Sequence, residues 1–202
     1  MLVGLGVVLW ALVLIFQGQA LSAHMLAPFS YVVTGLSVAV VLWERWLWAW
    51  PIFRGWLNKR PDIRGTWKGT LRSDWREPDT KQGLDPIEVF LVIRQTYTTI
   101  DVRLFSRESS SISLSGNIFT DSASVCTLAV TFRSTPRILK RDRSPVKPGG
   151  MLVSLVGSPI HKLDGEYWTD RATKGEVTLS VRTRATAHDF EEGTKLGFDV
   201  GR

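Results

Sequence analysis

The chain has 202 residues, of which 44% are hydrophobic and 22% charged, and its formal net charge is +6. Before Pro51 the only Asp, Glu, Lys or Arg residues are Glu44 and Arg45, whose charges cancel, so the net charge belongs entirely to the later part. This division excludes a uniformly soluble protein, and the apolar part is too short for more than two membrane spans of about 20 residues each. The single cysteine, Cys126, excludes an intrachain disulfide framework and a cysteine-rich zinc site.

Two apolar segments, Leu2–Phe16 and Pro28–Trp50, predict a pair of transmembrane helices. Tryptophans crowd the end of the second segment, which is typical of the lipid headgroup level. A cleaved signal peptide is the alternative for the first segment, but no Lys or Arg precedes its apolar core. Small residues on both segments, such as Gly4 and Gly35, allow close helix contact and are compatible with a homo-oligomer.

The distribution of cations predicts the orientation of these spans. Arg54, Lys59, Arg60 and Arg64 follow the second segment, whereas the connection at 17–27 has no Lys or Arg. By the positive-inside rule, the N-terminus and the chain after the second span lie in the cytoplasm, and the connection between the spans lies outside. We therefore divide the chain into a transmembrane hairpin (1–57), a basic juxtamembrane linker (58–64) and a cytoplasmic β-barrel domain (65–202).

From Arg64 onward the hydrophobic pattern has a period of two, and turn residues divide it into eight candidate strands. They are Arg64–Arg72, Ile87–Thr96, Thr98–Ser106, Ser110–Phe119, Ser124–Ser134, Met151–Gly157, Lys162–Thr169 and Gly175–Arg184. Eight sequential antiparallel strands favour an up-and-down barrel, and a two-sheet sandwich is the main alternative. The aliphatic face of each strand is expected inside and the polar face in water. The tail from His188 is expected to be a loop or a short closing strand.

The tripeptide Gly65–Trp67 (GTW) resembles the GxW motif of the first strand of lipocalin-like barrels. In that arrangement the tryptophan plugs the closed end of the barrel beneath an arginine from a late strand. Arg182 or Arg184 would be that partner here. The motif therefore adds support for an eight-stranded, antiparallel, lipocalin-like barrel.

Strong catalytic and metal signatures are missing from the sequence, and its three histidines are widely separated. Cys126 stands in an apolar strand, where inert packing is the usual role of a free cysteine. We therefore expect no enzyme activity, no cofactor and no bound metal.

The basic segment Arg137–Lys147 has three interpretations: a solvated loop, a contact with anionic lipid, or a phosphate-binding lid. No reading helix or zinc module accompanies the charge, so we expect no DNA or RNA partner.

The densest local motif is the hairpin Gly165–Val177. Tyr167 and Trp168 are adjacent and must point to opposite faces of a strand. The simple interpretation is an aromatic packing pair beside a turn. The functional interpretation is a barrel mouth in which one ring stacks on a base while the cations of the turn meet phosphate.

Three features occur together in this chain: two N-terminal spans, the sequence RGTWKG at 64–69, and the sequence LDGEYWTDRATKGEVTLS at 163–180. In this combination the chain resembles the CD-NTase-associated transmembrane β-barrel effectors of CBASS antiphage systems. The resemblance implies a sensor and effector in one chain. A partner nucleotidyltransferase makes a cyclic oligonucleotide, the barrel binds it, the chains assemble, and the spans disrupt the inner membrane in an abortive infection. A related class of defence uses the same architecture with the opposite response to ligand, so that the bound ligand keeps the effector inactive.

Because the resemblance does not assign individual contacts, the candidate site is chosen by chemistry: a cyclic dinucleotide needs cations and aromatic faces. The candidate ligand-binding residues are Arg94, Tyr97, Arg103, Tyr167, Arg171, Thr173 and Lys174. Two rival functions remain open at this point. One is a membrane-anchored, lipocalin-like binder of an apolar ligand, and the other is a filled barrel with a structural role.

Overall fold

The computed structural model describes residues 4, 15–16, 23–53, 56–77, 81–122, 125–142 and 144–198. The chain forms two compact units, residues 1–59 and residues 60–202, and each is described here by itself. The first predicted span, Leu2–Phe16, falls almost entirely outside the described residues.

The N-terminal unit contains helix α2 (Ala23–Arg45) and two short 3-10 helices, η1 (Leu47–Ala49) and η2 (Pro51–Phe53). The second predicted span, Pro28–Trp50, overlaps α2, but the helix begins and ends earlier than predicted. After α2 the chain folds back, with the rings of Trp43 and Phe53 edge to face at 5.2 Å. Among the helices in the described ranges, none combines the length and the apolar character needed to cross a membrane.

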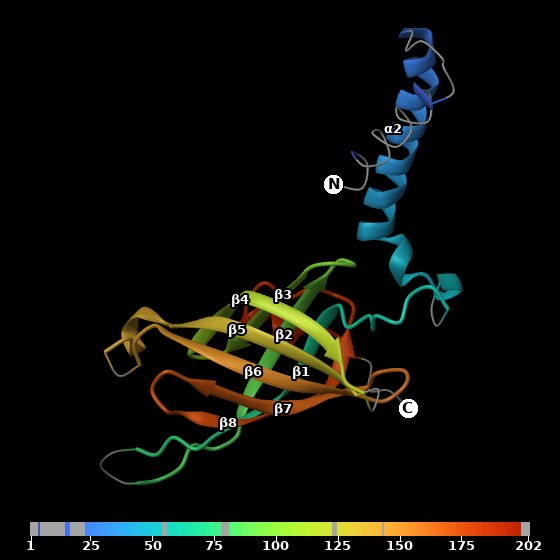
Figure 1. The fold of residues 1–202 in the computed structure, drawn as a ribbon. Coiled ribbons are helices and arrows are strands. Elements are labelled where there is room, and N and C mark those ends of the chain that lie inside the picture. Colours follow the sequence, from blue (N-terminus) through green and yellow to red (C-terminus); the bar gives the residue numbers. More distant parts are fainter. Residues whose placement is uncertain are drawn as a thin grey trace. The chain divides into compact units, whose positions relative to one another are not determined.

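Eight antiparallel strands form the second unit and close into a barrel in which each strand pairs with its neighbours in sequence and β1 pairs with β8 (Figure 1). The strands are β1 (Gly65–Ser73), β2 (Ile87–Gln95), β3 (Ile100–Ser106), β4 (Ser109–Thr120), β5 (Cys126–Pro136), β6 (Lys147–Val156), β7 (Lys162–Thr169) and β8 (Lys174–Thr183). The predicted up-and-down barrel is thus confirmed, and the sandwich alternative is wrong.

Strand β6 departs most from its predicted bounds, because it begins at Lys147 and not at Met151. The sequence Pro148–Gly150 is typical of a turn. Here, however, Gly149 and Gly150 pair with Phe132 and Thr131 of β5 and continue the ladder. Aromatic rings from the neighbouring strands occupy the space above both glycines, which explains why small residues stand there.

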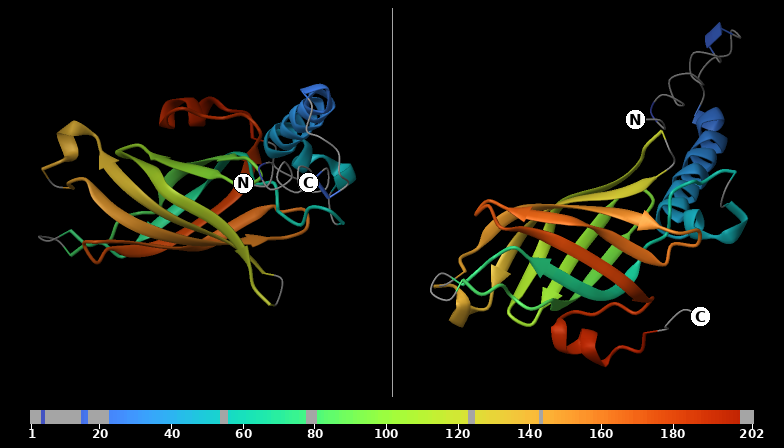
Figure 2. Two further views of the ribbon diagram at one scale, coloured as in Figure 1. Left: turned by 45° about the horizontal axis from the view of Figure 1, so that its top comes forward. Right: turned by 90° about the horizontal axis from the view of Figure 1, so that it is seen from below.

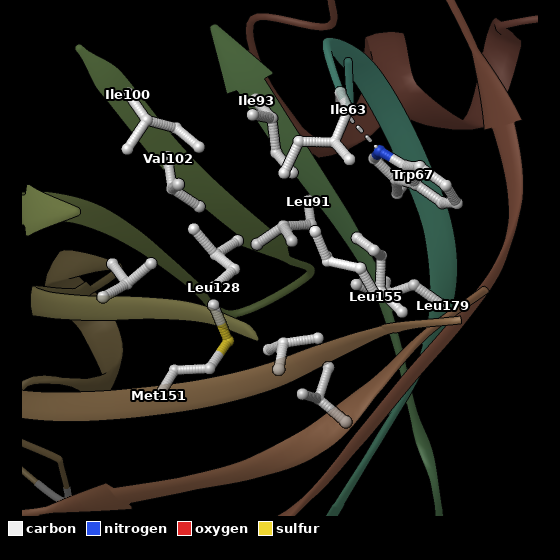
Figure 3. Packing of buried hydrophobic residues seen from close by; sticks show 14 of the residues in the cluster. Ile63, Trp67, Leu91, Ile93, Ile100, Val102, Leu128, Met151, Leu155 and Leu179 are labelled. Atoms are coloured by element: carbon white, nitrogen blue, oxygen red, sulfur yellow. Dashed lines mark hydrogen bonds between the residues drawn. The ribbon is translucent and has the colours of Figure 1, made fainter. Parts of the chain in front are cut away.

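The aliphatic strand faces point into the barrel, as predicted, and form one continuous core that includes Val89, Leu91, Leu128, Val153 and Leu179 (Figure 3). The alternation of side chains in a strand places every second residue inside, so a period-two sequence fills a barrel without further adjustment. Cys126 is half-buried and packs against this core, next to the hydroxyl of Thr120 at 3.3 Å.

Trp67 closes one end of the barrel. Its side chain is fully buried, and its indole N–H donates to the carbonyl of Ile63 at 2.9 Å (Figure 3). The guanidinium of Arg182 lies 5.1 Å from the centre of the Trp67 ring and donates to the carbonyls of Arg64 and Asp62. Arg182, and not Arg184, is therefore the late-strand partner of the GxW motif.

The C-terminal segment is helical and not a loop or strand, contrary to prediction. Helix α3 (Phe190–Lys195) begins at Asp189, whose side chain accepts from the backbone N–H of Glu192. Phe190 packs edge to face on Phe90 at 5.3 Å and helps to cover the outer face of β2 (Figure 2). This contact explains why a ring on the outward face of β2 is buried.

Candidate ligand-binding site

A cavity of about 450 Å³ opens at the end of the barrel opposite Trp67. Its deep wall is aliphatic and includes Val89, Leu91, Val102, Met151 and Val177. Its rim is formed by the four connections at that end, those between β1 and β2, β3 and β4, β5 and β6, and β7 and β8. These connections lie together at the left of Figure 1. The cavity is within the size range of small-molecule sites.

Three aromatic residues line the cavity, Trp75, Phe132 and Tyr167, and the last two each lie beside a glycine of the neighbouring strand. Tyr167 pairs with Gly175, and a Cβ at Gly175 would come within 2.7 Å of the tyrosine ring. Phe132 pairs with Gly149, where a Cβ would come within 2.6 Å of the phenylalanine ring. The glycines therefore let both rings lie close to the barrel wall, which leaves ring faces available to a planar ligand.

Serine hydroxyls occur repeatedly around the rim. Ser111 and Ser134 are a cross-strand pair on β4 and β5, and both are buried. Ser106 and Ser109 bond to each other across the β3–β4 turn, with 2.9 Å between their hydroxyl oxygens. Because a hydroxyl both donates and accepts, this rim can bond to sugar hydroxyls, phosphate oxygens or base edges.

Cations are concentrated on two rim connections. Lys147 and Arg171 both line the cavity, and the pKa of Lys147 is lowered by burial and then by the positive charge of Arg171, an effect that the carboxylate of Asp170 offsets only in part. Lys140 lines the cavity too, but Glu108 neutralises it with an ion pair of 2.9 Å. Lys147 and Arg171 are therefore held near each other without full compensation, and an anion in the mouth would relieve their repulsion.

The β7–β8 hairpin fixes the position of this part of the rim. The backbone N–H of Thr169 donates to the carbonyl of Thr173 at 2.9 Å, and Ala172 adopts a positive φ of 57° inside the turn. The pKa of the Tyr167 hydroxyl is raised, mainly because the side chain is buried and also because Asp74 is nearby. Tyr167 therefore stays neutral at physiological pH and can act as a donor.

Of the predicted site residues, Tyr167, Arg171 and Thr173 line the cavity together. Trp168 lies on the opposite face of β7 and is exposed, so the predicted division of the aromatic pair is confirmed. Lys174 begins β8 at the same end of the barrel but does not line the cavity; its backbone N–H donates to the Asp74 carboxylate at 2.9 Å.

Arg94, Tyr97 and Arg103 lie away from this cavity. Arg94 and Arg103 are on the outward faces of β2 and β3 and are exposed. Tyr97 is in the β2–β3 connection at the closed end, where its carbonyl accepts from Arg60. The structure therefore brings together the predicted site residues of the β7–β8 hairpin that line the cavity. It separates them from the predicted residues of β2, β3 and their connection.

Sequence reasoning missed the residues that complete the mouth. They are the rim serines Ser73, Ser106, Ser109, Ser111, Ser134 and Ser144, the cations Lys140 and Lys147, the acids Glu77 and Glu108, and the rings Trp75 and Phe132. The sequence held a usable signal for some of them, because Ser109 and Ser111 lie at the start of β4 in the alternating positions that face the interior. Lys140 and Lys147 belong to the basic segment Arg137–Lys147, for which a phosphate-binding lid was one of three interpretations, but neither was chosen as a site residue.

Taken together, the cavity offers ring faces, hydroxyls and two close cations above an aliphatic interior. This chemistry suits a ligand that has planar rings and negative charge. Within the described ranges, no group of three or more His, Cys, Asp or Glu residues could hold a metal ion.

Comparisons with known proteins agree with this description. The family model "Cap15, cyclic dinucleotide receptor domain" matches residues 58–181, which include β1 to β7 and β8 up to Val181 but not α3. A protein of Staphylococcus schleiferi named CD-NTase-associated protein 15 is 31% identical over 150 residues, covering 74% of this chain and 76% of that protein. The resemblance to CD-NTase-associated effectors is thus confirmed, and the chain belongs to the family of the Cap15 cyclic dinucleotide receptor domain.

Proposed function

We propose that the chain is an antiphage effector whose barrel binds a cyclic dinucleotide in the cavity at its open end. The observation that carries this proposal is that Lys147, Arg171 and Tyr167 line one cavity, with Lys147 close enough to feel the charge of Arg171. Membership of a family described as cyclic dinucleotide receptors supports it. The role is that of a receptor and not a catalyst.

The cavity residues divide the recognition of such a ligand among them. Tyr167 and Phe132 stack on the bases, a contact of about 1 to 3 kcal/mol per base. Lys147 and Arg171 face the phosphates, where charge-assisted hydrogen bonds are about twice as strong as neutral ones. Thr173 and the rim serines bond to the sugars and base edges.

The N-terminal part completes the proposed effector. Two spans in 1–57 anchor the chain in the bacterial inner membrane, with the barrel in the cytoplasm, because cations follow the second apolar segment. Barrel occupancy controls homo-oligomerisation and disruption of the bilayer, in either the activating or the silencing direction. The partner enzyme is a nucleotidyltransferase, which the name of the Staphylococcus schleiferi relative supports.

The test is a calorimetric titration of the full-length protein, in a neutral detergent, with purine and pyrimidine cyclic dinucleotides. We expect saturable binding by at least one of them and a loss of about tenfold to a hundredfold for the double variant Lys147→Ala, Arg171→Ala. The matched control is Arg72→Ala with Arg133→Ala, which removes the same charge from exposed positions outside the cavity. Absence of binding across the whole panel would refute the proposal.

A membrane-anchored binder of an apolar ligand is the second candidate, because the deep cavity wall is aliphatic. The two functions respond differently to salt. Binding of a dianion weakens as ionic strength rises, whereas burial of an apolar ligand does not. Affinity for a fatty acid ester that is unaffected by both salt and the Lys147, Arg171 double variant would favour this second function.

A further inference from the structure

A second hollow of about 360 Å³ lies at the closed end of the barrel, away from the proposed dinucleotide cavity. Arginines from three adjacent strand ends surround it: Arg94 near the end of β2, Arg64 before β1 and Arg184 after β8. The register explains the gathering, since Gly65 pairs with Ile93 and Thr66 pairs with Thr183. We call this hollow the arginine groove.

The carboxylate of Asp62 forms ion pairs with two of the three groove arginines, Arg64 and Arg184. Its carboxylate accepts from Arg64 at 2.9 and 3.0 Å and lies 3.8 Å from Arg184, and only 6% of its side chain is exposed. The same carboxylate lies 3.6 Å from Arg182, which is already committed to the Trp67 ring. The pKa of Asp62 is lowered: burial raises it, but the hydrogen bonds and charge of Arg64 outweigh that effect.

The positive charge available to a ligand belongs to Arg94 and Arg184. Within the described part of the chain, Arg94 forms no ion pair, although Asp101 is its cross-strand neighbour on β3. Arg184 lines the groove, and its side chain is 75% exposed although it lies 3.8 Å from the Asp62 carboxylate. Like charges on neighbouring strands repel each other, and such an arrangement persists at functional sites where a ligand supplies the missing charge.

We propose that the arginine groove binds a phosphate group, separately from the cavity at the open end. The planar fork of an arginine matches phosphate oxygens with two parallel hydrogen bonds, and Arg94 and Arg184 in the groove lining can supply such forks. The hydroxyl-bearing Thr186 also lines it and can add a neutral donor. Gln95 stabilises the wall by bonding to the backbone of Ile63 and Pro61 on either side of Asp62.

Phosphate of this kind can come from an anionic lipid or from solution. The lipid source rests on the proposed function, which puts the segment before the barrel in a membrane. The first residues of the barrel unit, including Ile63, lie at the closed end. A lipid headgroup in the groove would then make barrel orientation sensitive to anionic lipid.

The experiment is native mass spectrometry of the full-length protein in neutral detergent, titrated in separate arms with short-chain phosphatidylglycerol, short-chain phosphatidylcholine and inorganic phosphate. We expect phosphatidylglycerol to bind better than phosphatidylcholine and to lose about tenfold in affinity in the Arg94→Gln, Arg184→Gln variant. The control is Arg72→Gln with Arg133→Gln, which should behave as wild type. Titration with cyclic dinucleotide in the same samples should be unaffected by the groove variant.

The outcomes separate the two proposals. Phosphate binding that exceeds that of both lipids and is lost in the groove variant supports the site and assigns it to a soluble phosphate. Equal weakening in the two double variants, or no binding of any phosphate compound above phosphatidylcholine, overturns it. Failure of cyclic dinucleotide binding with intact groove binding overturns the proposed function alone.

Discussion

The two ends of the barrel are built from the same eight strands but have opposite character. At the closed end, Trp67 fills the interior, and its one polar atom bonds to Ile63 at 2.9 Å. At the open end, serines, two aromatic rings and the Lys147–Arg171 pair replace the aliphatic side chains. Trp67 and Ser73 are only six positions apart on β1, but Trp67 lies at the closed end and Ser73 at the open end. Alternation thus sets which side chains point inward, and position along the strand sets what those side chains do.

This contrast separates stability from binding. The closed end loses large buried area and specific hydrogen bonds when it is altered, so substitutions there should unfold the barrel. At the open end the half-buried Lys147 lies near the positive charge of Arg171, an arrangement that does not favour folding. Substitutions there should change ligand affinity and leave stability largely intact.

The strongest test of the contrast is Trp67→Ala. Removal of this fully buried ring should lower the free energy of unfolding by about 3 to 5 kcal/mol, because it leaves a cavity and removes the contact between the ring and the Arg182 guanidinium. Urea unfolding followed by near-ultraviolet circular dichroism measures the change. The control Trp56→Ala removes a ring that is 76% exposed and should have little effect. Equal losses in the two variants would mean that Trp67 does not plug the barrel.

The open end should respond in the opposite way. The single variant Arg171→Ala should weaken cyclic dinucleotide binding about tenfold through loss of a charge-assisted contact, with a melting temperature close to that of wild type. Isothermal calorimetry and thermal unfolding on one preparation measure both quantities. Lys174→Ala is the matched control, because Lys174 belongs to the same hairpin but does not line the cavity. A larger loss of affinity in Lys174→Ala would contradict the assignment of the mouth.

Asp62 should make the closed end sensitive to acid. Because its folded-state pKa lies below the ordinary value of 3.8, its charge stabilises the fold above that pH, and the contribution is lost as the pH falls through the folded-state pKa. Asp62→Asn should therefore cost about 1 to 3 kcal/mol at neutral pH, and the difference from wild type should shrink below about pH 4. Chemical denaturation at several pH values measures this convergence. A constant difference down to strongly acidic pH would show that the charge of Asp62 contributes nothing.

The smallest expected effect is a pH dependence at the mouth. The pKa of Lys147 is lowered by burial and by Arg171, so its charge is lost at a lower pH than that of an ordinary lysine. Dianion affinity should consequently decline as the pH rises through this lowered pKa, and Lys147→Arg should move the decline to higher pH. Calorimetric titration across the alkaline range detects the difference. Identical profiles for wild type and Lys147→Arg would exclude Lys147 as the titrating contact.

Much of the barrel could be predicted because strand formation is a local property. The alternation of apolar and polar residues identified all eight strands, and the GTW motif identified the plug of the closed end. The hairpin Gly165–Val177 correctly predicted part of the cavity rim. Strand alternation identified Tyr167 as a candidate for the inward face, and the turn that follows contains Arg171 and Thr173. The C-terminal helix was missed because six residues are too few to show a helical period.

What the sequence by itself determined is therefore the inward or outward direction of each side chain, because that depends only on parity within a strand. Tertiary structure alone decided which distant residues share an end of the barrel. The register between β1 and β2 placed Arg94 near Arg64 at the closed end, and the closure of β1 onto β8 added Arg184. The register between β6 and β7, in which Gly149 pairs with Thr169, placed Lys147 near Arg171 at the mouth. Register between strands is set by the packing of the whole barrel, and no local pattern encodes it.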